Sequence, residues 1–189
     1  MNLQRRPDRW ERFEAGLPTE WPFTEVERYD AVDGQRCKPP GWWKQGPGAW
    51  GCYRTHMRIL EECLNAGTES VLIFEDDALF PDDFTSQWKL LKPHVPDDWG
   101  MLYLGGQHLM RAQRQPKMIN DHIVQPYNVN RTHAYAVNQR LMETLYRHLN
   151  AITTWRNRHH IDHHYGLLHM TGKHNVYAPV KWLVGRVGG

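Results

Sequence analysis

A short apolar run that ends in three adjacent carboxylates is the most informative pattern along the chain. Val71 to Phe74 is apolar throughout, and Glu75, Asp76 and Asp77 follow directly. A run this short and this apolar predicts a fully buried central strand. Adjacent like charges repel and raise one another's pKa, so a bound cation would lower the electrostatic cost of this strand end. A solvated acidic turn that leads into the next helix is the alternative interpretation.

The rest of the chain alternates between helical and strand periods. Apolar positions at helical spacing predict helices, and short β-branched or alternating runs predict strands. This succession predicts an α/β sandwich. Because no repeat or composition shift marks a boundary, residues 1–189 are expected to form one domain. Helices are expected at 7–15, 51–65, 82–91 and 138–149, and strands at 23–31, 71–74, 101–106, 132–137 and 176–178.

A long loop rich in Pro and Gly precedes the second predicted helix. Residues 35–50 also hold Trp42, Trp43 and Trp50. A loop of this length inside a small domain is more often functional than idle. It predicts either a mobile flap over a substrate or a surface loop that packs its Trp side chains on the core.

Arginines gather around the start of the first predicted helix. Arg5, Arg6 and Arg9 surround Pro7 and Asp8 in this segment. Cationic side chains beside a helix N-terminus favour an anion site, and a diphosphate is one candidate. A solvated basic face is the alternative.

A histidine-rich segment lies near the end of the chain. His159, His160, His163 and His164 surround Asp162. Imidazole and carboxylate groups at this density are able to bind a transition metal. The same residues would also form an ordinary polar start to a helix, with Asp162 in its first turn.

Composition narrows the class of protein. The chain has 189 residues, of which 40% are hydrophobic and 23% charged, and its formal net charge is +2. This small excess argues against a purely electrostatic nucleic-acid binder. The three cysteines form no C-x-x-C pair, which fits free thiols in a reducing compartment. No apolar run approaches the roughly 18 residues of a transmembrane helix, and the charged N-terminus is not typical of a signal peptide, so a cytoplasmic protein is expected.

Short motifs spread along the chain occur in a specific order. They are Asn2–Arg9 (NLQRRPDR), Ala31–Gly34 (AVDG), Gly51–His56 (GCYRTH), Leu72–Ala78 (LIFEDDA), Leu102–Gly105 (LYLG), Thr132–Tyr135 (THAY) and Ile161–Asp162 (ID). Each is weak alone, but together and in this order they are a strong signal. The series resembles glycosyltransferase family 25, which contains lipopolysaccharide-type sugar transferases and procollagen galactosyltransferases.

The resemblance implies an A-type glycosyltransferase (GT-A) fold, with a Rossmann-like mixed sheet flanked by helices in a single domain. It implies a nucleotide-sugar half over residues 1–106 and an acceptor half over residues 107–189. It also implies inverting transfer of galactose or glucose from a UDP-sugar, with Mn²⁺ or Mg²⁺ as the cofactor. The expected partners are a nucleotide sugar and a carbohydrate or glycosylated acceptor.

The same resemblance implies roles for single residues. Glu75 and Asp77 would form a DXD-like metal motif, and His169 or His174 would complete the metal shell. Since an inverting transfer needs a group that takes the proton of the acceptor hydroxyl, we expect Asp162, flanked by histidines, to be the catalytic base; the alternative is that it only orients the acceptor. The donor would contact Asn2, Leu3, Arg5, Arg6, Arg9, Ala31, Asp33, His56, Asp76 and Gly105. Apart from the resemblance, we expect the acceptor to contact Trp42, Trp43, Tyr135 and His163, because flat aromatic faces are suited to stacking on sugar rings.

The leading hypothesis is therefore a metal-dependent inverting glycosyltransferase. Two other classes stay open at this point. One is a metal-dependent hydrolase built on the histidines from His159 to His164. The other is a non-catalytic carbohydrate-binding domain that uses Trp42, Trp43 and Trp50.

Overall fold

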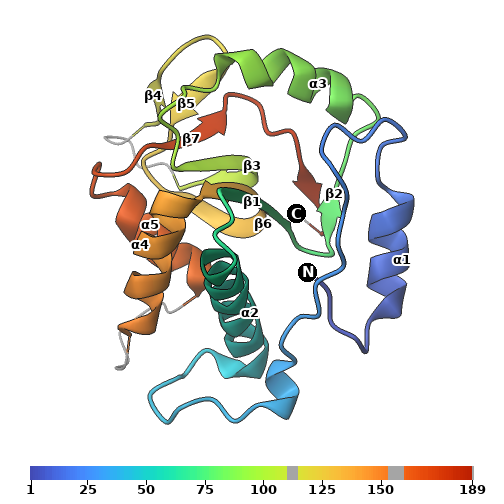
Figure 1. Ribbon diagram of the computed structural model, residues 1–189, viewed down its shortest axis with the longest axis vertical. Coiled ribbons are helices and arrows are strands. Elements are labelled where there is room, and N and C mark those ends of the chain that lie inside the picture. The colour runs from blue at the N-terminus through green and yellow to red at the C-terminus, as the bar shows by residue number, and fades with distance from the viewer. Residues whose placement is uncertain (110–114, 153–159, 189) are drawn as a thin grey trace.

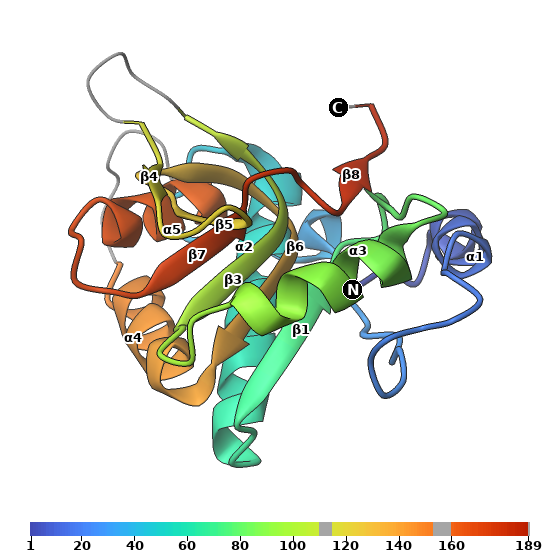
Figure 2. The ribbon, with the colours of Figure 1, turned by 90° about the horizontal axis from the view of Figure 1, so that it is seen from above.

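A six-stranded sheet forms the centre of the fold, with helices on both faces (Figures 1 and 2). The structure is a computed structural model that describes residues 1–109, 115–152 and 160–188. The strands of this sheet are β1 (Ser70–Phe74), β3 (Met101–His108), β4 (Lys117–Met118), β5 (Ile123–Gln125), β6 (Val129–Asn138) and β7 (Val176–Pro179). Their order is β1-β6-β3-β7-β5-β4. Strands β3 and β7 are parallel, and the other described pairs in this sheet are antiparallel.

Helices cover the two faces of the sheet unequally. The described helices are α1 (Pro7–Ala15), α2 (Gly46–Asn65), α3 (Phe84–Leu91), α4 (Gln139–Asn150) and α5 (Ile161–His169), with 3₁₀ turns η1 (Gly34–Arg36) and η2 (Lys92–His94). Helices α2, α4 and α5 pack on one face, and α3 packs on the other (Figures 1 and 2). The predicted α/β class, with a mixed sheet flanked by helices, is therefore confirmed.

Alternate residues of β3 contribute to two separate cores. Met101 and Tyr103 belong to the core under α2, α4 and α5. Leu102 and Leu104 belong to the opposite core, with Phe84 of α3. Successive side chains of a strand point to opposite faces, so a strand covered on both faces is apolar at nearly every position.

The prediction of a central strand at residues 71–74 is wrong. Strand β1 lies at the edge of the sheet, where β6 is its partner among the described strands. Ile73 packs in one core and Phe74 in the other. The apolar run therefore reflects two covered faces, because periodicity reports on the faces of a strand and not on its hydrogen-bonding edges.

The predicted strand at residues 23–31 is also wrong. An isolated parallel bridge joins Asn2 to Asp30, and the backbone from 23 to 29 is irregular. Phe23 packs against Trp21, Phe84 and Trp88 instead of alternating between two sheet faces. The bridge matters for the site because it fixes Asn2 beside the end of β1.

A second, two-stranded sheet joins distant parts of the chain. Strand β2 (Ala78–Leu79) pairs in antiparallel fashion with β8 (Gly185–Arg186). The backbone N–H of Val187 also donates to the carbonyl oxygen of Asp77 at 2.9 Å. These contacts place Arg186 directly beside the acidic residues that follow β1.

Helix α2 begins earlier than predicted, at Gly46, so the preceding loop is shorter. Gly51 lies inside the helix and touches the η1 segment, where a Cβ would overlap the carbonyl oxygen of Val32 and the backbone of Gly34. Gly48 lies one turn earlier and has open space around it. The absent side chain at Gly51 therefore allows residues 32–34 to pack closely on α2.

We expect Gly51→Ala to destabilise the protein by about 1–3 kcal/mol, because the new methyl group meets backbone atoms that cannot rotate away. Gly48→Ala is the matched control and should be neutral or stabilising by up to about 1 kcal/mol, as expected for Ala in a helix. Urea unfolding of the three proteins measures both effects. Equal stabilities for the two variants would contradict the close contact at Gly51.

Candidate functional site

The three adjacent carboxylates lie on a tight turn between β1 and β2. The backbone N–H of Glu75 donates to the carbonyl oxygen of His133 at 3.0 Å, which continues the pairing of β1 with β6. The N–H of Ala78 then donates to the carbonyl oxygen of Glu75 at 3.1 Å and closes the turn. The carboxylates therefore emerge where β1 ends, as the sequence predicts.

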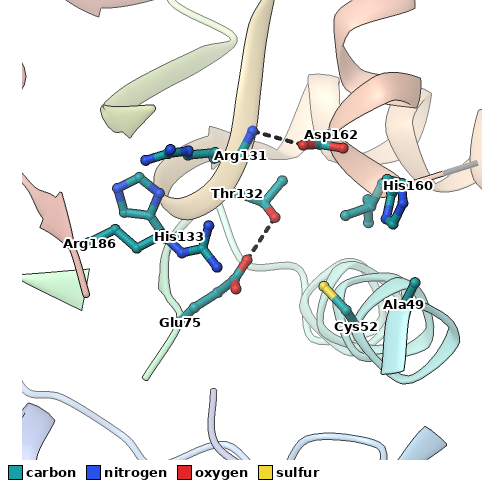
Figure 3. Close-up of a pocket in the computed structure, with 10 residues that line it drawn as sticks. Ala49, Cys52, Glu75, Arg131, Thr132, His133, His160, Asp162 and Arg186 are labelled. Carbon is teal, nitrogen blue, oxygen red and sulfur yellow. Dashed lines mark hydrogen bonds between the residues drawn. The ribbon is translucent and has the colours of Figure 1, made fainter. Parts of the chain in front are cut away.

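Glu75 points into a cavity beside β6 (Figure 3). Its Oε1 accepts a hydrogen bond from the Thr132 hydroxyl at 2.7 Å and lies 3.5 Å from His56 Nε2. Burial favours the protonated acid, but the His56 ring and the Thr132 hydroxyl together outweigh burial and lower the pKa of Glu75 to about 2. Glu75 is therefore an anion over the whole physiological range.

Asp76 and Asp77 are held by different partners from Glu75. Asp76 accepts a hydrogen bond from Asn2 Nδ2 at 2.6 Å and pairs with Arg9 at 3.0 Å. Asp77 accepts from Arg186 Nε at 2.7 Å through Oδ2, and Arg9 lies 3.8 Å from the same oxygen. The other oxygen, Asp77 Oδ1, is buried and has no hydrogen-bond partner within the described residues. Two arginines thus provide much of the charge compensation that the sequence assigned to a metal.

Asp162 lines the same cavity as Glu75 (Figure 3). It lies in the first turn of α5, where its Oδ1 accepts from the His163 N–H at 2.8 Å. Its Oδ2 accepts from the Arg131 backbone N–H at 2.9 Å. Two hydrogen bonds from different segments therefore fix the orientation of this carboxylate.

The cavity has a volume of about 190 Å³ and a mixed polar lining. Glu75 and Asp162 share it with two arginines, two histidines and several smaller residues. These others are Ala49, Cys52, Arg131, Thr132, His133, His160, Ile161 and Arg186. Anionic and cationic groups thus face one small volume, an arrangement suited to binding a charged and hydroxylated ligand.

A bulge in β6 directs several of these residues toward the cavity. The register of β6 against β3 jumps between Asn130 and Ala134, so three residues of β6 stand opposite one residue of β3. These three are Arg131, Thr132 and His133. Arg131 has a φ of 77°, in the left-handed region that side chains other than Gly seldom adopt. Bulges are common beside active sites because they change the direction of side chains.

His133 is a tightly packed member of this bulge. Burial lowers the pKa of His133, so it is neutral at physiological pH. Gly105, which the sequence assigned to the donor, lies against it, and a Cβ there would overlap the His133 ring and the Val184 carbonyl oxygen. Gly105 itself does not line the cavity. Its role in this structure is to permit close packing of β3 on β6.

The two histidines expected to complete a metal shell lie elsewhere. His169 is buried in the helix-covered core, where its Nε2 is 3.4 Å from the Tyr103 hydroxyl. Burial lowers the pKa of His169 to about 3. His174 lies beyond α5 in the turn before β7, and neither histidine lines the cavity. The structure does not bring them together with Glu75 and Asp77.

The aromatic residues assigned to the acceptor are also distributed differently. Trp43 is 6% exposed and donates its indole N–H to the Gly46 carbonyl oxygen, while Trp42 packs partly buried beside it. Both contact Trp50 in the core cluster, which matches the alternative of a loop that packs on the core. Tyr135 is buried and hydrogen-bonded to His56.

The N-terminal residues assigned to the donor form separate pairs. Arg5 pairs with Asp33 at 2.8 Å, and Arg6 pairs with Asp8 at 2.7 Å on the surface. Of the three arginines, Arg9 contacts the acidic turn directly. Leu3 and Ala31 flank the bridge between Asn2 and Asp30.

The histidine-rich segment does not form a metal centre in its described part. His159 lies outside the described residues. His160 lines the cavity, and the His163 ring packs edge-on against the His160 ring. His164 is buried and packs against Tyr53 and His148. The described side chains thus point to different places, which gives the hydrolase hypothesis no support from geometry.

Sequence reasoning missed several residues of the cavity. The sequence analysis assigned no role to Cys52, Thr132 and His133, although all three line the cavity. They lie within the family-like motifs, and that position could have marked them as candidates. Arg131 and Arg186 lie outside these motifs, so no such indication marks them in the sequence. The β6 bulge brings Arg131 to the cavity, and the pairing of β8 with β2 brings Arg186.

Comparison with known proteins agrees with the resemblance. Residues 46–164, which include Glu75, the β6 bulge and Asp162, match the family described as "Glycosyltransferase family 25 (LPS biosynthesis protein)". The chain belongs to glycosyltransferase family 25. The match excludes the N-terminal arginines and Arg186.

Curated relatives carry two kinds of name. "Inactive glycosyltransferase 25 family member 3" of Homo sapiens is 34% identical over 128 residues, covering 56% of this chain and 21% of that protein. "Probable inactive glycosyltransferase 25 family member 3" of Bos taurus is 32% identical over 128 residues, with the same coverage of 56% and 21%. "Procollagen galactosyltransferase 1" of Danio rerio is 31% identical over 75 residues, covering 38% of this chain and 12% of that protein. This chain spans about a fifth of the length of the first two relatives.

Within the part of the chain that the structure describes, no helix is both long and apolar enough to span a membrane.

The low pKa of Glu75 predicts a pH dependence of stability. Because the folded-state pKa is about 2 and the ordinary value is 4.5, the stabilisation is complete above the ordinary value and is lost as pH falls toward 2. Between pH 6 and pH 3 the wild type should lose about 2 kcal/mol relative to Glu75→Gln. Glu14→Gln, at an exposed position of α1, is the control and should parallel the wild type. Chemical unfolding across this range tests the prediction, and parallel curves for wild type and Glu75→Gln would contradict it.

Proposed function

We propose that this protein transfers a sugar, galactose or glucose, from a UDP-sugar to a hydroxyl group of a glycan or protein acceptor, with inversion at the anomeric carbon. The observation that carries the proposal is the shared cavity of Glu75 and Asp162, with Arg131 and Arg186 in its wall. Membership of glycosyltransferase family 25 supports it. We also propose that the six-stranded mixed sheet is a single-domain GT-A fold.

Asp162 is the proposed catalytic base. In an inverting transfer the acceptor oxygen forms a bond to the anomeric carbon while the bond from that carbon to the UDP oxygen breaks. The acceptor hydroxyl gives up its proton in this step, and a correctly placed carboxylate accepts it. The backbone N–H groups of Arg131 and His163 hold the Asp162 carboxylate in a fixed orientation. Orientation of this kind contributes to rate because no reorganisation is needed during the reaction.

Cationic side chains would bind the donor diphosphate. Arg131 and Arg186 reach the cavity from β6 and β8, and Arg9 reaches the adjacent acidic turn from α1. A guanidinium group binds phosphate through parallel hydrogen bonds and stays charged at any physiological pH. These residues would therefore bind the negative charge that builds up on UDP as it leaves.

Glu75 and Asp77 are suited to a hard divalent cation. Both offer carboxylate oxygens, the ligands that Mn²⁺ and Mg²⁺ prefer. Asp77 Oδ1 is a buried oxygen without a hydrogen-bond partner among the described residues, and a cation would satisfy it. A metal ion held by these residues would act as a Lewis acid toward the diphosphate. We leave His169 and His174 out of this set because they lie away from the carboxylates.

A second candidate is a domain that binds a nucleotide sugar or glycan without transferring sugar. The names of the human and bovine relatives, which describe those proteins as inactive, favour this possibility. Experiment can separate ligand binding from sugar transfer, because substitution of the proposed catalytic base would abolish transfer and leave binding of the nucleotide sugar intact.

Asp77→Asn should weaken Mn²⁺-dependent UDP binding by at least tenfold, since the carboxylate is replaced by a neutral amide that binds a hard cation less strongly. Isothermal titration calorimetry with and without Mn²⁺ measures this effect. Asp82→Asn, at an exposed position in the following loop, is the control and should bind like the wild type. Unchanged Mn²⁺-dependent affinity in Asp77→Asn would overturn the metal assignment.

Asp162→Ala should lower kcat by about 10²–10⁴-fold while UDP affinity stays within a factor of two, because a general base acts on the transition state and not on the donor. Release of UDP from UDP-galactose and UDP-glucose, with a panel of glycan and collagen-type acceptors, measures kcat. Wild-type binding without any transfer would favour the non-catalytic candidate. Full activity in Asp162→Ala would refute the role of this residue as the base.

A further inference from the structure

Three potential metal ligands of different chemistry meet at the inner wall of the cavity. Cys52 and His56 are four residues apart on α2, so they lie on the same face of the helix. Glu75 approaches them from the end of β1. One potential ligand atom from each of the three residues lies within 4.8 Å of the other two.

The environment of His56 provides a second, independent observation. His56 is 0% exposed, and its Nε2 has no hydrogen-bond partner among the described residues. An unsatisfied polar nitrogen in the core is destabilising, so its presence requires an explanation. Glu75 Oε1 lies 3.5 Å from this nitrogen, which makes an ion pair when the ring is protonated but is too long for a good hydrogen bond.

The opposite nitrogen of His56 is oriented by a chain of hydroxyl groups. His56 Nδ1 lies 2.8 Å from the Tyr135 hydroxyl, which in turn lies 3.1 Å from the Tyr165 hydroxyl. When Nδ1–H donates to Tyr135 and Tyr135 donates to Tyr165, Nε2 faces Cys52 and Glu75, and a metal ion bound there would take the place of the Nε2 proton that otherwise faces the Glu75 carboxylate. Histidines that bind metals commonly donate their other N–H to an oxygen acceptor in this way.

The ligand set selects the kind of metal. Sulfur, nitrogen and oxygen ligands together are typical of Zn²⁺, whereas Mn²⁺ and Mg²⁺ prefer oxygen alone. Zinc bonds of about 2.0–2.3 Å in a tetrahedral site separate two ligands by roughly 3.5 Å. The distance from His56 Nε2 to Glu75 Oε1 is 3.5 Å. Cys52 and Glu75 both line the cavity, so a fourth coordination position would face it.

We propose that Cys52, His56 and Glu75 bind Zn²⁺, with the fourth coordination position open to the cavity. Three protein ligands and one open position are the arrangement of zinc sites that bind an exogenous water or ligand. The site uses Glu75, which the proposed function assigns to the donor metal. Zinc bound here would therefore exclude Mn²⁺ from Glu75, and this consequence alone rests on the proposed function.

The test uses metal-free protein without any nucleotide, so its outcome does not depend on sugar transfer. Titration with Zn²⁺ against a chromophoric chelator should give one tight site per chain. Co²⁺ in place of Zn²⁺ should give the intense visible bands of a tetrahedral ion and the near-ultraviolet band of a Co²⁺–thiolate bond. Absence of one-to-one binding by the wild type would overturn the proposal.

Substitutions then identify the ligands. Cys52→Ser and His56→Asn should weaken Zn²⁺ binding by at least 100-fold, and Cys52→Ser should also remove the thiolate band. The chain offers two matched controls, exposed Cys37 and half-buried Cys63, and Cys37→Ser and Cys63→Ser should bind like the wild type. A thiolate band that disappears with either control, or that survives in Cys52→Ser, would refute the site.

Two measurements keep the proposal falsifiable if a substitution in this core prevents folding, which circular dichroism would reveal. X-ray absorption of the zinc-loaded wild type should show one sulfur ligand with the remaining ligands nitrogen or oxygen, and a shell without sulfur would overturn the assignment. Tyr135→Phe removes the acceptor of the His56 N–H and should weaken Zn²⁺ binding by about tenfold. Unchanged affinity in this variant would contradict the proposed orientation of His56.

Discussion

The need to compensate three adjacent carboxylates shapes this end of the molecule. Partners for the carboxylates come from several parts of the chain: β6 and α2 contact Glu75, the N-terminal segment and α1 contact Asp76, and β8 and α1 contact Asp77. A buried charge without a partner costs several kcal/mol, so these contacts stabilise the folded chain. Segments that are distant in sequence therefore converge on one turn. The cavity lies where they meet, and its mixed charge follows directly from that convergence.

Much of the fold was predictable because its signals are local. The helix at residues 7–15 ends as Gly16 predicts, and Asn138 caps α4 by accepting a hydrogen bond from the Leu141 N–H. The acidic run does end a strand, and the ordered motifs correctly indicated the family. The meeting of Glu75 with Asp162 in one cavity also agrees with the roles that the resemblance implied for them. Those roles themselves stay predictions.

What the sequence did not reveal depends on pairing between distant segments. The edge position of β1 and the arrival of Arg186 beside Asp77 follow from strand partners, which periodicity does not specify. The bulge that turns Arg131 and His133 toward the cavity is a change of register between β3 and β6, and no residue pattern in β6 predicts this change. Trp43 was assigned to the acceptor by its chemistry, yet the same flat apolar ring serves equally well in a core. Residue chemistry and the ordered motifs therefore identified the candidate residues, and topology decided which of them meet.

The backbone conformation of Arg131 links the stability of the fold to the composition of the cavity wall. Its left-handed φ of 77° costs of order 1–2 kcal/mol for a residue with a Cβ, and Gly would remove that cost. The same conformation presents the Arg131 N–H to Asp162 and its side chain to the cavity. Exchange of Arg131 for Gly would relieve this strain and keep a backbone N–H for Asp162, but it would remove the guanidinium group from the cavity wall. The strained backbone at this position is thus the cost of placing a cationic side chain, and not merely a backbone donor, beside Asp162.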